Sequence, residues 1–235
     1  MTKTIWISRT QPSAENSAKL WENAGYKAIV APLLNVIQAP HTPIEPSSDD
    51  ILIFTSKNGV NAYQNYGFKT VQNVITVGDA TARFARDIGF TNVTSARGTS
   101  MDVTRVILKN ADIKLADKTR SIIHCAGKHI RGSICEDLQA AGYTARRDLY
   151  YQSEVIRTWP EIDYKALTHI AFYSPLAAQS FCALMSDMSS RPTSLDVHNY
   201  VFISISKAVD AALGNLQPAM RKIAQDPHEA AMLLA

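Results

Sequence analysis

Short runs of apolar residues recur along the chain, and the stretches between them carry apolar residues three or four positions apart. A short apolar run is typical of a buried strand. The wider spacing is typical of a helix with one apolar face. Strands that alternate with helices predict parallel sheets covered on both faces, which is an α/β fold. The clearest runs are residues 5–8, 53–56, 74–78, 122–125, 171–174 and 200–204.

These runs form two degenerate copies of one strand-and-helix unit. Residues 5–8 resemble 122–125, and the helical pattern after each run stops at the same tripeptide. The tripeptides are Ala24-Gly25-Tyr26 and Ala141-Gly142-Tyr143. Glycine suits the left-handed position just after a helix, so we expect both helices to end there.

The rest of the two copies also matches in order. Residues 53–56 pair with 171–174, and residues 74–78 pair with 200–204, which sets Gly78 against Ser204. Parallel sheets of this class bind ligands at the carboxyl ends of their strands. We therefore expect functional residues at those ends, with the working site between the two copies. The expected positions are Arg9, Ser56, Gly78, Gly127, Ser174 and Ser204.

Composition fits a globular protein and narrows its partners. The 235 residues are 46% apolar and 19% charged, and no stretch approaches the ~18 apolar residues of a membrane span. The N-terminus turns polar too soon for a signal peptide, so we expect a cytoplasmic protein, with a monomer as the default. The net charge of +3 comes with no basic run, so neither nucleic acid nor a membrane is expected as a partner.

The sequence lacks the usual cofactor and metal motifs. Its three cysteines have no CxxC spacing, and its six histidines are scattered. No GxGxxG, GxxxxGK[ST], HExxH or GxSxG occurs. We therefore expect no metal site and no cofactor.

The remaining candidates for a binding site are polar residues at the expected helix starts. Helix N-termini present free backbone N–H groups and a partial positive charge, which would suit a carboxylate-rich anion. The alternative is that these serines are only N-caps, each worth about 1 kcal/mol. Both interpretations stay open for Ser56-Lys57-Asn58, Gly78 with Thr81, Ser174, and Ser206-Lys207.

Several segments in fixed order resemble uroporphyrinogen-III synthases. Phe54-Thr55-Ser56-Lys57-Asn58-Gly59-Val60 is similar to their F-T-S-x-x-A-V segment, with Gly59 in place of the alanine. The other similar segments are Ser8-Arg9-Thr10-Gln11-Pro12, Val77-Gly78-Asp79-Ala80-Thr81-Ala82, Gly127 to Arg131, Leu149-Tyr150-Tyr151-Gln152 and Tyr173-Ser174-Pro175. In the second copy the family's I-G-x-x-T-A glycine is replaced, and we assign that replacement to Ser204.

The resemblance implies two similar flavodoxin-like α/β domains with parallel sheets, joined by a two-stranded linker. One domain would hold residues 1–37 and 156–235, and the other residues 40–152. The linkers would lie near 38–39 and 153–155, where the proline-rich segment 39–46 and the segment 153–159 interrupt the repeat.

The resemblance also implies the reaction. The family closes the linear tetrapyrrole hydroxymethylbilane to uroporphyrinogen III, with loss of water and inversion of ring D, and uses no cofactor. By this resemblance the chain is expected to be a carbon–oxygen lyase of haem biosynthesis, and a transient contact with the preceding enzyme of the pathway is expected. The implied substrate contacts are Arg9, Ser56, Lys57, Asn58, Gly78, Thr81, Gly127, Lys128, Arg131, Ser174, Ser206 and Lys207.

The implied proton donor for the leaving hydroxyl is Tyr151, with Tyr150 as the residue that could exchange roles with it. Two rival classes remain: a two-domain module that only binds or senses a small molecule, and a flavodoxin-like electron carrier with a bound flavin. Turnover of hydroxymethylbilane and flavin absorbance would separate the three.

Overall fold

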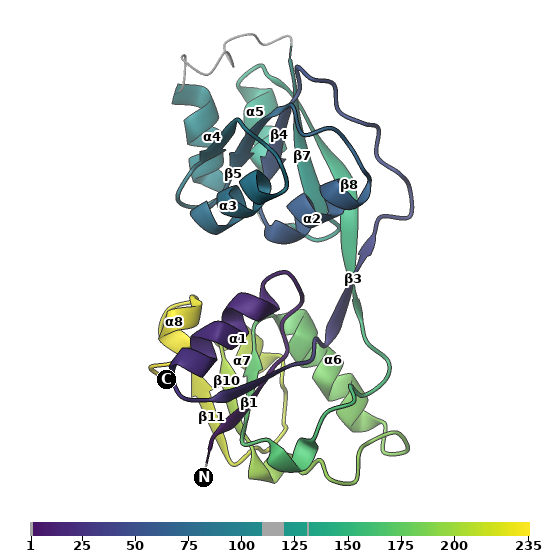
Figure 1. Cartoon of the computed structure of the whole chain (residues 1–235), viewed down its shortest axis with the longest axis vertical. Coiled ribbons are helices and arrows are strands. Elements are labelled where there is room, and N and C mark those ends of the chain that lie inside the picture. Colours follow the sequence, from purple (N-terminus) through teal and green to yellow (C-terminus); the bar gives the residue numbers. More distant parts are fainter. Residues whose placement is uncertain (1, 110–119, 131) are drawn as a thin grey trace. The chain divides into compact units, whose positions relative to one another are not determined.

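The computed structural model describes residues 2–109, 120–130 and 132–235, and its contacts divide the chain into two compact units. Unit 1 holds residues 1–35 and 154–235, and unit 2 holds residues 36–153 (Figure 1). The first unit is therefore discontinuous in sequence, and the second is inserted into it.

Unit 1 is built on a five-stranded parallel sheet of order β11-β10-β9-β1-β2. Its strands are β1 (Thr4–Ile7), β2 (Lys27–Val30), β9 (His169–Phe172), β10 (Val201–Ser204) and β11 (Met220–Ile223). Its helices are α1 (Ala14–Asn23), α6 (Pro175–Ser186), α7 (Lys207–Ala211) and α8 (Glu229–Met232), with the 3-10 turns η2 (Tyr164–Ala166) and η3 (Val197–Asn199).

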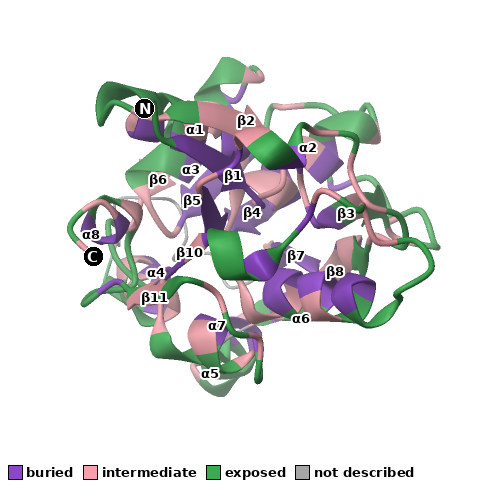
Figure 2. Cartoon of the chain, turned by 90° about the horizontal axis from the view of Figure 1, so that it is seen from below, coloured by how far each residue is buried: buried purple, intermediate pink, exposed green. Residues whose placement is uncertain are grey.

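Alternate residues of these strands enter two separate cores. Trp6 of β1 packs with Phe181 of α6 on one face of the sheet. Ile5 and Ile7 pack with Trp21 of α1 on the other face. Because successive side chains of a strand point to opposite faces, a strand covered on both sides must be apolar throughout. Strand β1 is fully buried for that reason (Figure 2).

Unit 2 is built on a six-stranded sheet of order β3-β8-β7-β4-β5-β6. Its strands are β3 (Leu34–Gln38), β4 (Ile51–Phe54), β5 (Asn73–Thr76), β6 (Val93–Ser95), β7 (Ser121–Gly127) and β8 (Thr144–Val155). Its helices are α2 (Lys57–Asn65), α3 (Asp79–Asp87), α4 (Ser100–Lys109) and α5 (Ile134–Ala140). Strands β4 to β8 pair in parallel, as predicted for the α/β fold.

The two faces of this sheet also have distinct cores. Ile107 of α4 and Leu138 of α5 pack on one face. Val60 of α2, Ala85 of α3 and Tyr150 of β8 pack on the other. Tyr151 borders the second core, so the side chains of two consecutive residues of β8 lie on one face of the sheet.

The chain crosses between the units in β3 and at the end of β8, and these strands are neighbours in the sheet. Ala39 N–H donates to the Tyr150 carbonyl, whereas Ile156 N–H donates to the Leu33 carbonyl. Residue numbers rise in one strand as they fall in the other, so this pair is antiparallel. Residues 39–46, which the prolines predicted to be irregular, contain no helix or strand.

The sheets confirm that the chain repeats. Strands β2-β1-β9-β10-β11 of unit 1 correspond in order to β8-β7-β4-β5-β6 of unit 2. The predicted glycine stops are also confirmed, because Gly25 and Gly142 have φ of 86° and 84°. In both copies the glycine and the tyrosine after it donate their N–H groups back to the last turn of the helix, which is the Schellman pattern. The tyrosine bonds are Tyr26 N–H to Trp21 O and Tyr143 N–H to Leu138 O.

One pairing from the sequence is wrong by two residues. Gly78 is the N-cap of α3 and Ser206 is the N-cap of α7, each two residues beyond the last residue of the preceding strand. Ser204 instead ends β10 and is fully buried. The apolar run of 74–78 extends past the end of β5 at Thr76, and that extra length misaligned the copies. Ser206, and not Ser204, therefore occupies the place of Gly78.

Candidate functional site

The carboxyl edge of the unit 2 sheet brings four predicted residues close together. Ser56 follows β4, Gly127 ends β7, and Tyr151 lies beside Gly127 in β8. The strands run parallel, so their carboxyl ends meet at one edge. Lys57 begins α2 directly after Ser56, and helix α2 therefore starts at this edge.

Ser56 makes the central hydrogen bonds of this edge. Its Oγ accepts from Gly59 N–H at 3.3 Å, which is the N-cap bond predicted from the sequence. The same Oγ lies 2.8 Å from the Tyr151 hydroxyl. Lys57 and Asn58, the other two predicted residues of this turn, are half-buried.

The Tyr151 hydroxyl is consequently held at the N-terminus of α2. Burial raises the pKa of Tyr151, and the hydrogen bond with Ser56 opposes that rise. The phenol is therefore protonated near neutral pH. A protonated phenol fixed at a helix start, where N–H groups and the helix dipole stabilise negative charge, is suited to donate a proton.

Tyr150 has a different environment. Its side chain is 0% exposed and packs against Tyr63, Tyr66 and Phe68. Its hydroxyl has no hydrogen-bond partner among the described residues. Burial, with the neighbouring Cys125 thiol as the next cause, raises the pKa of Tyr150.

A second polar contact lies beneath this turn. Thr55 Oγ1 is 3.2 Å from His124 Nε2 in β7. His124 is 1% exposed, and burial, with Arg147 as a second cause, lowers its pKa to about 4. The neutral imidazole thus ties the residue before Ser56 to the neighbouring strand. Sequence patterns alone do not pair these two residues, because their contact depends on the β4–β7 register.

The other predicted residues of unit 2 differ in accessibility. Thr81 is 8% exposed within α3, so its side chain faces the core more than the solvent. Gly127 is buried. Lys128 is exposed, and its N–H donates to the Tyr151 carbonyl. Arg131 lies outside the described residues.

In unit 1, Arg9 is engaged with other residues of its own unit. Its Nη1 lies 3.2 Å from Glu229 Oε2, and its guanidinium lies 5.2 Å from the centre of the Tyr173 ring. The Tyr173 hydroxyl accepts from Trp21 Nε1 at 2.9 Å, and burial, followed by the nearby Glu229 carboxylate, raises the pKa of Tyr173. The ion pair joins residues 220 positions apart, which no local pattern indicates.

The two predicted serines of unit 1 are both N-caps. Ser174 Oγ accepts from Ala177 N–H at 3.2 Å, with Pro175 in the first turn of α6. Ser206 Oγ accepts from Val209 N–H at 3.4 Å. Lys207, next to Ser206, is exposed and forms no ion pair with a described residue.

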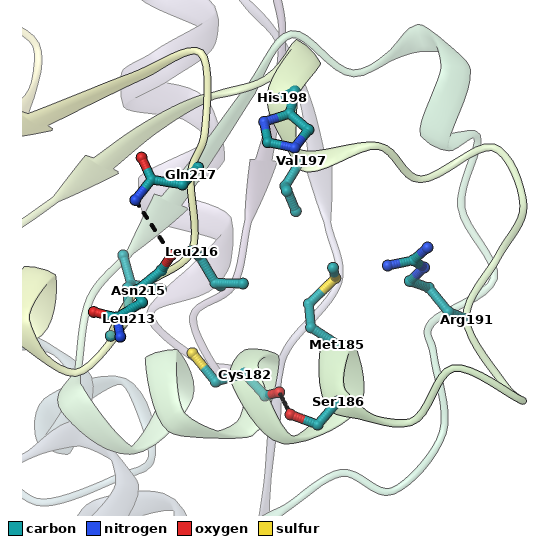
Figure 3. Close-up of a pocket in the computed structure, with 11 residues that line it drawn as sticks. Cys182, Met185, Ser186, Arg191, Val197, His198, Leu213, Asn215, Leu216 and Gln217 are labelled. Atoms are coloured by element: carbon teal, nitrogen blue, oxygen red, sulfur yellow. Dashed lines mark hydrogen bonds between the residues drawn. The ribbon is translucent and has the colours of Figure 1, made fainter.

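A separate hollow lies within unit 1, away from these residues. Its volume is about 560 Å³, and its walls include Cys182 and Met185 of α6 with Leu213, Leu216, Arg191 and His198 (Figure 3). These residues come from the end of α6 and from the segments that precede β10 and β11, at the amino edge of the sheet. None of the predicted site residues lines it.

The described residues contain neither a cluster of metal ligands nor a membrane-spanning helix. No group of three or more histidine, cysteine, aspartate or glutamate side chains in that part of the chain could hold a metal ion. No helix in the same residues is long and apolar enough to cross a membrane.

Comparison with known proteins gives one family. A family described as uroporphyrinogen-III synthase HemD matches residues 15–233. Among solved structures, the uroporphyrinogen-III synthetase of Helicobacter pylori is 18% identical with a TM-score of 0.60, covering 100% of this chain and 97% of its own. A mutant uroporphyrinogen III synthase of Thermus thermophilus is 12% identical with a TM-score of 0.46, covering 99% and 96%. A search of the curated proteins found no match.

Proposed function

The chain belongs to the uroporphyrinogen-III synthase family, and from this premise we propose that it closes hydroxymethylbilane to uroporphyrinogen III with Tyr151 as the proton donor. The observation that carries the proposal is the 2.8 Å contact between the Tyr151 hydroxyl and Ser56 Oγ at the start of α2. The contact supports the proposal because it joins the phenol hydroxyl to the N-cap residue of a helix at the sheet edge.

The substrate carries eight carboxylates, so its binding needs groups that stabilise negative charge. Helix N-termini can stabilise such charge through backbone N–H groups and the helix dipole, and both α2 and α3 begin at the carboxyl edge of the unit 2 sheet. Lys128 and Lys207 add exposed ammonium groups. Each exposed ion pair contributes only about 0.2–1 kcal/mol, so affinity would arise from several weak contacts together.

Arg9 is assigned a smaller part in binding than the sequence suggested. A substrate carboxylate could pair with Arg9 only in competition with Glu229, which already lies 3.2 Å from it. We propose that Arg9 mainly fixes the turn after β1 against α8.

The chemical step needs the C–O bond to the leaving hydroxyl to break. Tyr151 would give its proton to that hydroxyl, which departs as water. The carbocation left on the methylene of the first ring is then attacked by the carbon of ring D that carries the bridge to the third ring. That bridge bond breaks, and the methylene cation it leaves on the third ring bonds to the unsubstituted α-carbon of ring D, which inverts the ring. The same α-carbon then loses one proton. That proton returns to the Tyr151 oxygen, so the enzyme is regenerated and the balance is the loss of one water.

The phenolate that exists between these two transfers needs stabilisation. Ser56 Oγ–H can donate to it, because the N-cap bond to Gly59 uses Oγ only as an acceptor. The partial positive charge at the start of α2 acts in the same direction. A positioned acid of this kind contributes about 10²–10⁴-fold in rate.

Three further assignments follow from the proposed reaction. The protein would be a carbon–oxygen lyase, it would work in the cytoplasm, and it would receive its unstable linear substrate from the enzyme that makes it. No observation favours the alternative of a non-enzymatic binding or sensor module.

Steady-state turnover tests the proposal against that alternative. Supplied with hydroxymethylbilane, the protein should consume it at a rate proportional to protein concentration and many times faster than spontaneous closure. A binding module would slow or leave unchanged the spontaneous rate, because it holds the substrate without an acid to assist departure of the hydroxyl.

A further inference from the structure

Gly127 lies directly under the ring of Tyr151. A Cβ atom at position 127 would lie 2.7 Å from both Cε2 and Cζ of that ring and 3.1 Å from its hydroxyl oxygen. Ordinary van der Waals contact for a Cβ begins at about 3.4 Å. Residue 127 has no strained backbone in the left-handed region, so its glycine is required by space and not by conformation.

A bulge in β8 brings Tyr151 to this place. Ala126 pairs with Leu149, but Gly127 pairs with Tyr151, so Tyr150 is an extra residue in the ladder. Such a bulge reverses the alternation of the residues beyond it. Tyr151 therefore lies on the same face of the sheet as Tyr150, which is the face that α2 covers.

Gly59 sets the distance of α2 from this ring. A Cβ at position 59 would lie 2.8 Å from the Cys125 carbonyl oxygen, 3.4 Å from Phe54 Cδ1 and 3.8 Å from Tyr151 Cε1. The absence of a side chain lets the first turn of α2 approach β7 closely. Ser56, three residues earlier, is held at that turn by its N-cap bond to Gly59 N–H.

We propose that Gly127, supported by Gly59, is a positioning residue that forms a slot for the Tyr151 ring and so aims its hydroxyl at Ser56. The inference rests on the proposed function in one respect, since Tyr151 is the acid of the reaction there. The slot itself rests only on the distances around Gly127, Gly59 and Tyr151.

The consequence of filling the slot is a displaced hydroxyl. An alanine at 127 must push the ring outward by roughly 1 Å to reach normal contact, and the 2.8 Å bond to Ser56 then lengthens or breaks. A misplacement of that size at a reacting group can cost about 100-fold in rate.

A double-mutant cycle on turnover tests this role. Gly127→Ala is expected to lower kcat by about 100-fold with a smaller change in KM. In a Tyr151→Phe background the ring and the clash remain but the hydroxyl is gone, so adding Gly127→Ala should change kcat less than 2-fold. Equal losses in both backgrounds would show that Gly127 acts on general structure, which would overturn the proposal.

Ile107→Ala serves as the control for lost stability. Ile107 is buried in the other core of unit 2, on the face of the sheet opposite Tyr151. This variant removes core packing from the same unit but leaves the slot intact. It should retain near wild-type kcat at a temperature at which it is folded.

A spectroscopic measurement separates the slot from the proposed reaction. Tyr151 labelled with ¹³C at Cζ should titrate at lower pH in Gly127→Ala than in wild type, because the ring leaves its buried position. Ile107→Ala should titrate as wild type does. If Tyr151→Phe proves fully active, Tyr151 is not the proton donor, but the titration still tests whether Gly127 positions the Tyr151 ring. An unchanged Tyr151 resonance and titration in Gly127→Ala would overturn the positioning role of Gly127.

A fold-rescue variant covers the case in which Gly127→Ala does not fold. Leucine at 151 lacks the Cε2, Cζ and hydroxyl atoms that a Cβ at 127 would meet. The slot predicts that Gly127→Ala/Tyr151→Leu folds when Gly127→Ala alone does not. Failure of the double variant would mean that Gly127 is required by the backbone, and the proposal would be wrong.

Discussion

At the scale of single residues, Tyr150 and Tyr151 are adjacent in sequence but have different surroundings in the structure. The resemblance placed the acid at Tyr151, where the family's tyrosine falls, and left adjacent Tyr150 as the residue that could exchange roles with it. In the structure Tyr150 is enclosed among aromatic rings, whereas the hydroxyl of Tyr151 reaches the start of α2. The β8 bulge creates this difference, and a bulge depends on strand register that adjacent letters do not encode.

The matched phenylalanine variants should therefore behave differently. Tyr151→Phe is expected to lower kcat by about 10²–10⁴-fold because the proton donor is lost. Tyr150→Phe removes a buried hydroxyl with no described partner, so activity should be unchanged and stability equal or slightly higher. Steady-state kinetics and urea unfolding of the pair check both statements. Wild-type turnover in Tyr151→Phe would exclude that residue as the acid.

The buried histidines predict how stability depends on pH. Burial lowers the pKa of His124 and of His169 to about 4, against 6.5 for an exposed histidine. Between these values the unfolded chain binds more protons than the folded one, so stability falls as pH falls through this window. Each histidine should remove about 2 kcal/mol from the free energy of unfolding between pH 7 and pH 5.

Replacing one histidine isolates its share of that loss. His124→Gln should lose about half as much free energy of unfolding over this range as the wild type, whatever its stability at pH 7. Urea unfolding at pH 7 and pH 5 measures this loss in the variant and in the wild type. An equal loss of unfolding free energy in His124→Gln and the wild type would contradict the assignment to His124.

At the scale of helices and strands, the features predicted from the sequence are those that depend on neighbouring residues. Apolar runs identified β1, β4, β5, β7, β9 and β10, whereas β2, β3, β6, β8 and β11 were not among the predicted strands. Serine before a helical stripe identified the N-caps at Ser56, Ser174 and Ser206. The glycine stops at Gly25 and Gly142 also follow from local conformation. What failed was the pairing of Gly78 with Ser204, because an apolar run does not mark where a strand ends.

The corrected pairing predicts opposite effects for two nearby serines. Ser206→Ala removes the N-cap of α7 and should cost about 1 kcal/mol of stability. Ser204→Ala removes a buried hydroxyl with no described partner and should cost little or stabilise slightly. Thermal unfolding of the two variants compares them directly. A larger loss in Ser204→Ala would restore the original pairing.

At the scale of the whole molecule, the repeat predicted two sheets of the same topology, and the strand orders confirm it. The contacts that join distant parts of the chain were not predictable from pattern. The Arg9–Glu229 ion pair spans 220 positions, and the Thr55–His124 contact depends on which strands become neighbours. Arg9 was predicted as a substrate contact, and no pattern in the sequence indicated its ion pair with Glu229.

Binding of a polycarboxylate through exposed charges predicts a salt dependence. Raising ionic strength from 0.1 M to 1 M shortens the screening length from about 10 Å to about 3 Å, so KM should rise roughly ten-fold with a smaller change in kcat. Lys128→Gln and Lys207→Gln should each raise KM about 1.5- to 5-fold at low salt.

Lys165→Gln is the matched control for those variants. Lys165 is also exposed, but it precedes β9 at the amino edge of the unit 1 sheet. At each salt concentration, the Lys165→Gln variant should have the same KM as the wild type. A KM indifferent to salt, or equally sensitive to all three lysines, would contradict carboxylate binding by Lys128 and Lys207.

The identity of the product tests the central claim most directly. Hydroxymethylbilane closes without a catalyst to the type I isomer, whose ring D is not inverted. With enzyme in excess over substrate, chromatography of the cyclised products should show the type III isomer as the main product. Type I alone, formed at the rate seen without protein, would contradict the account.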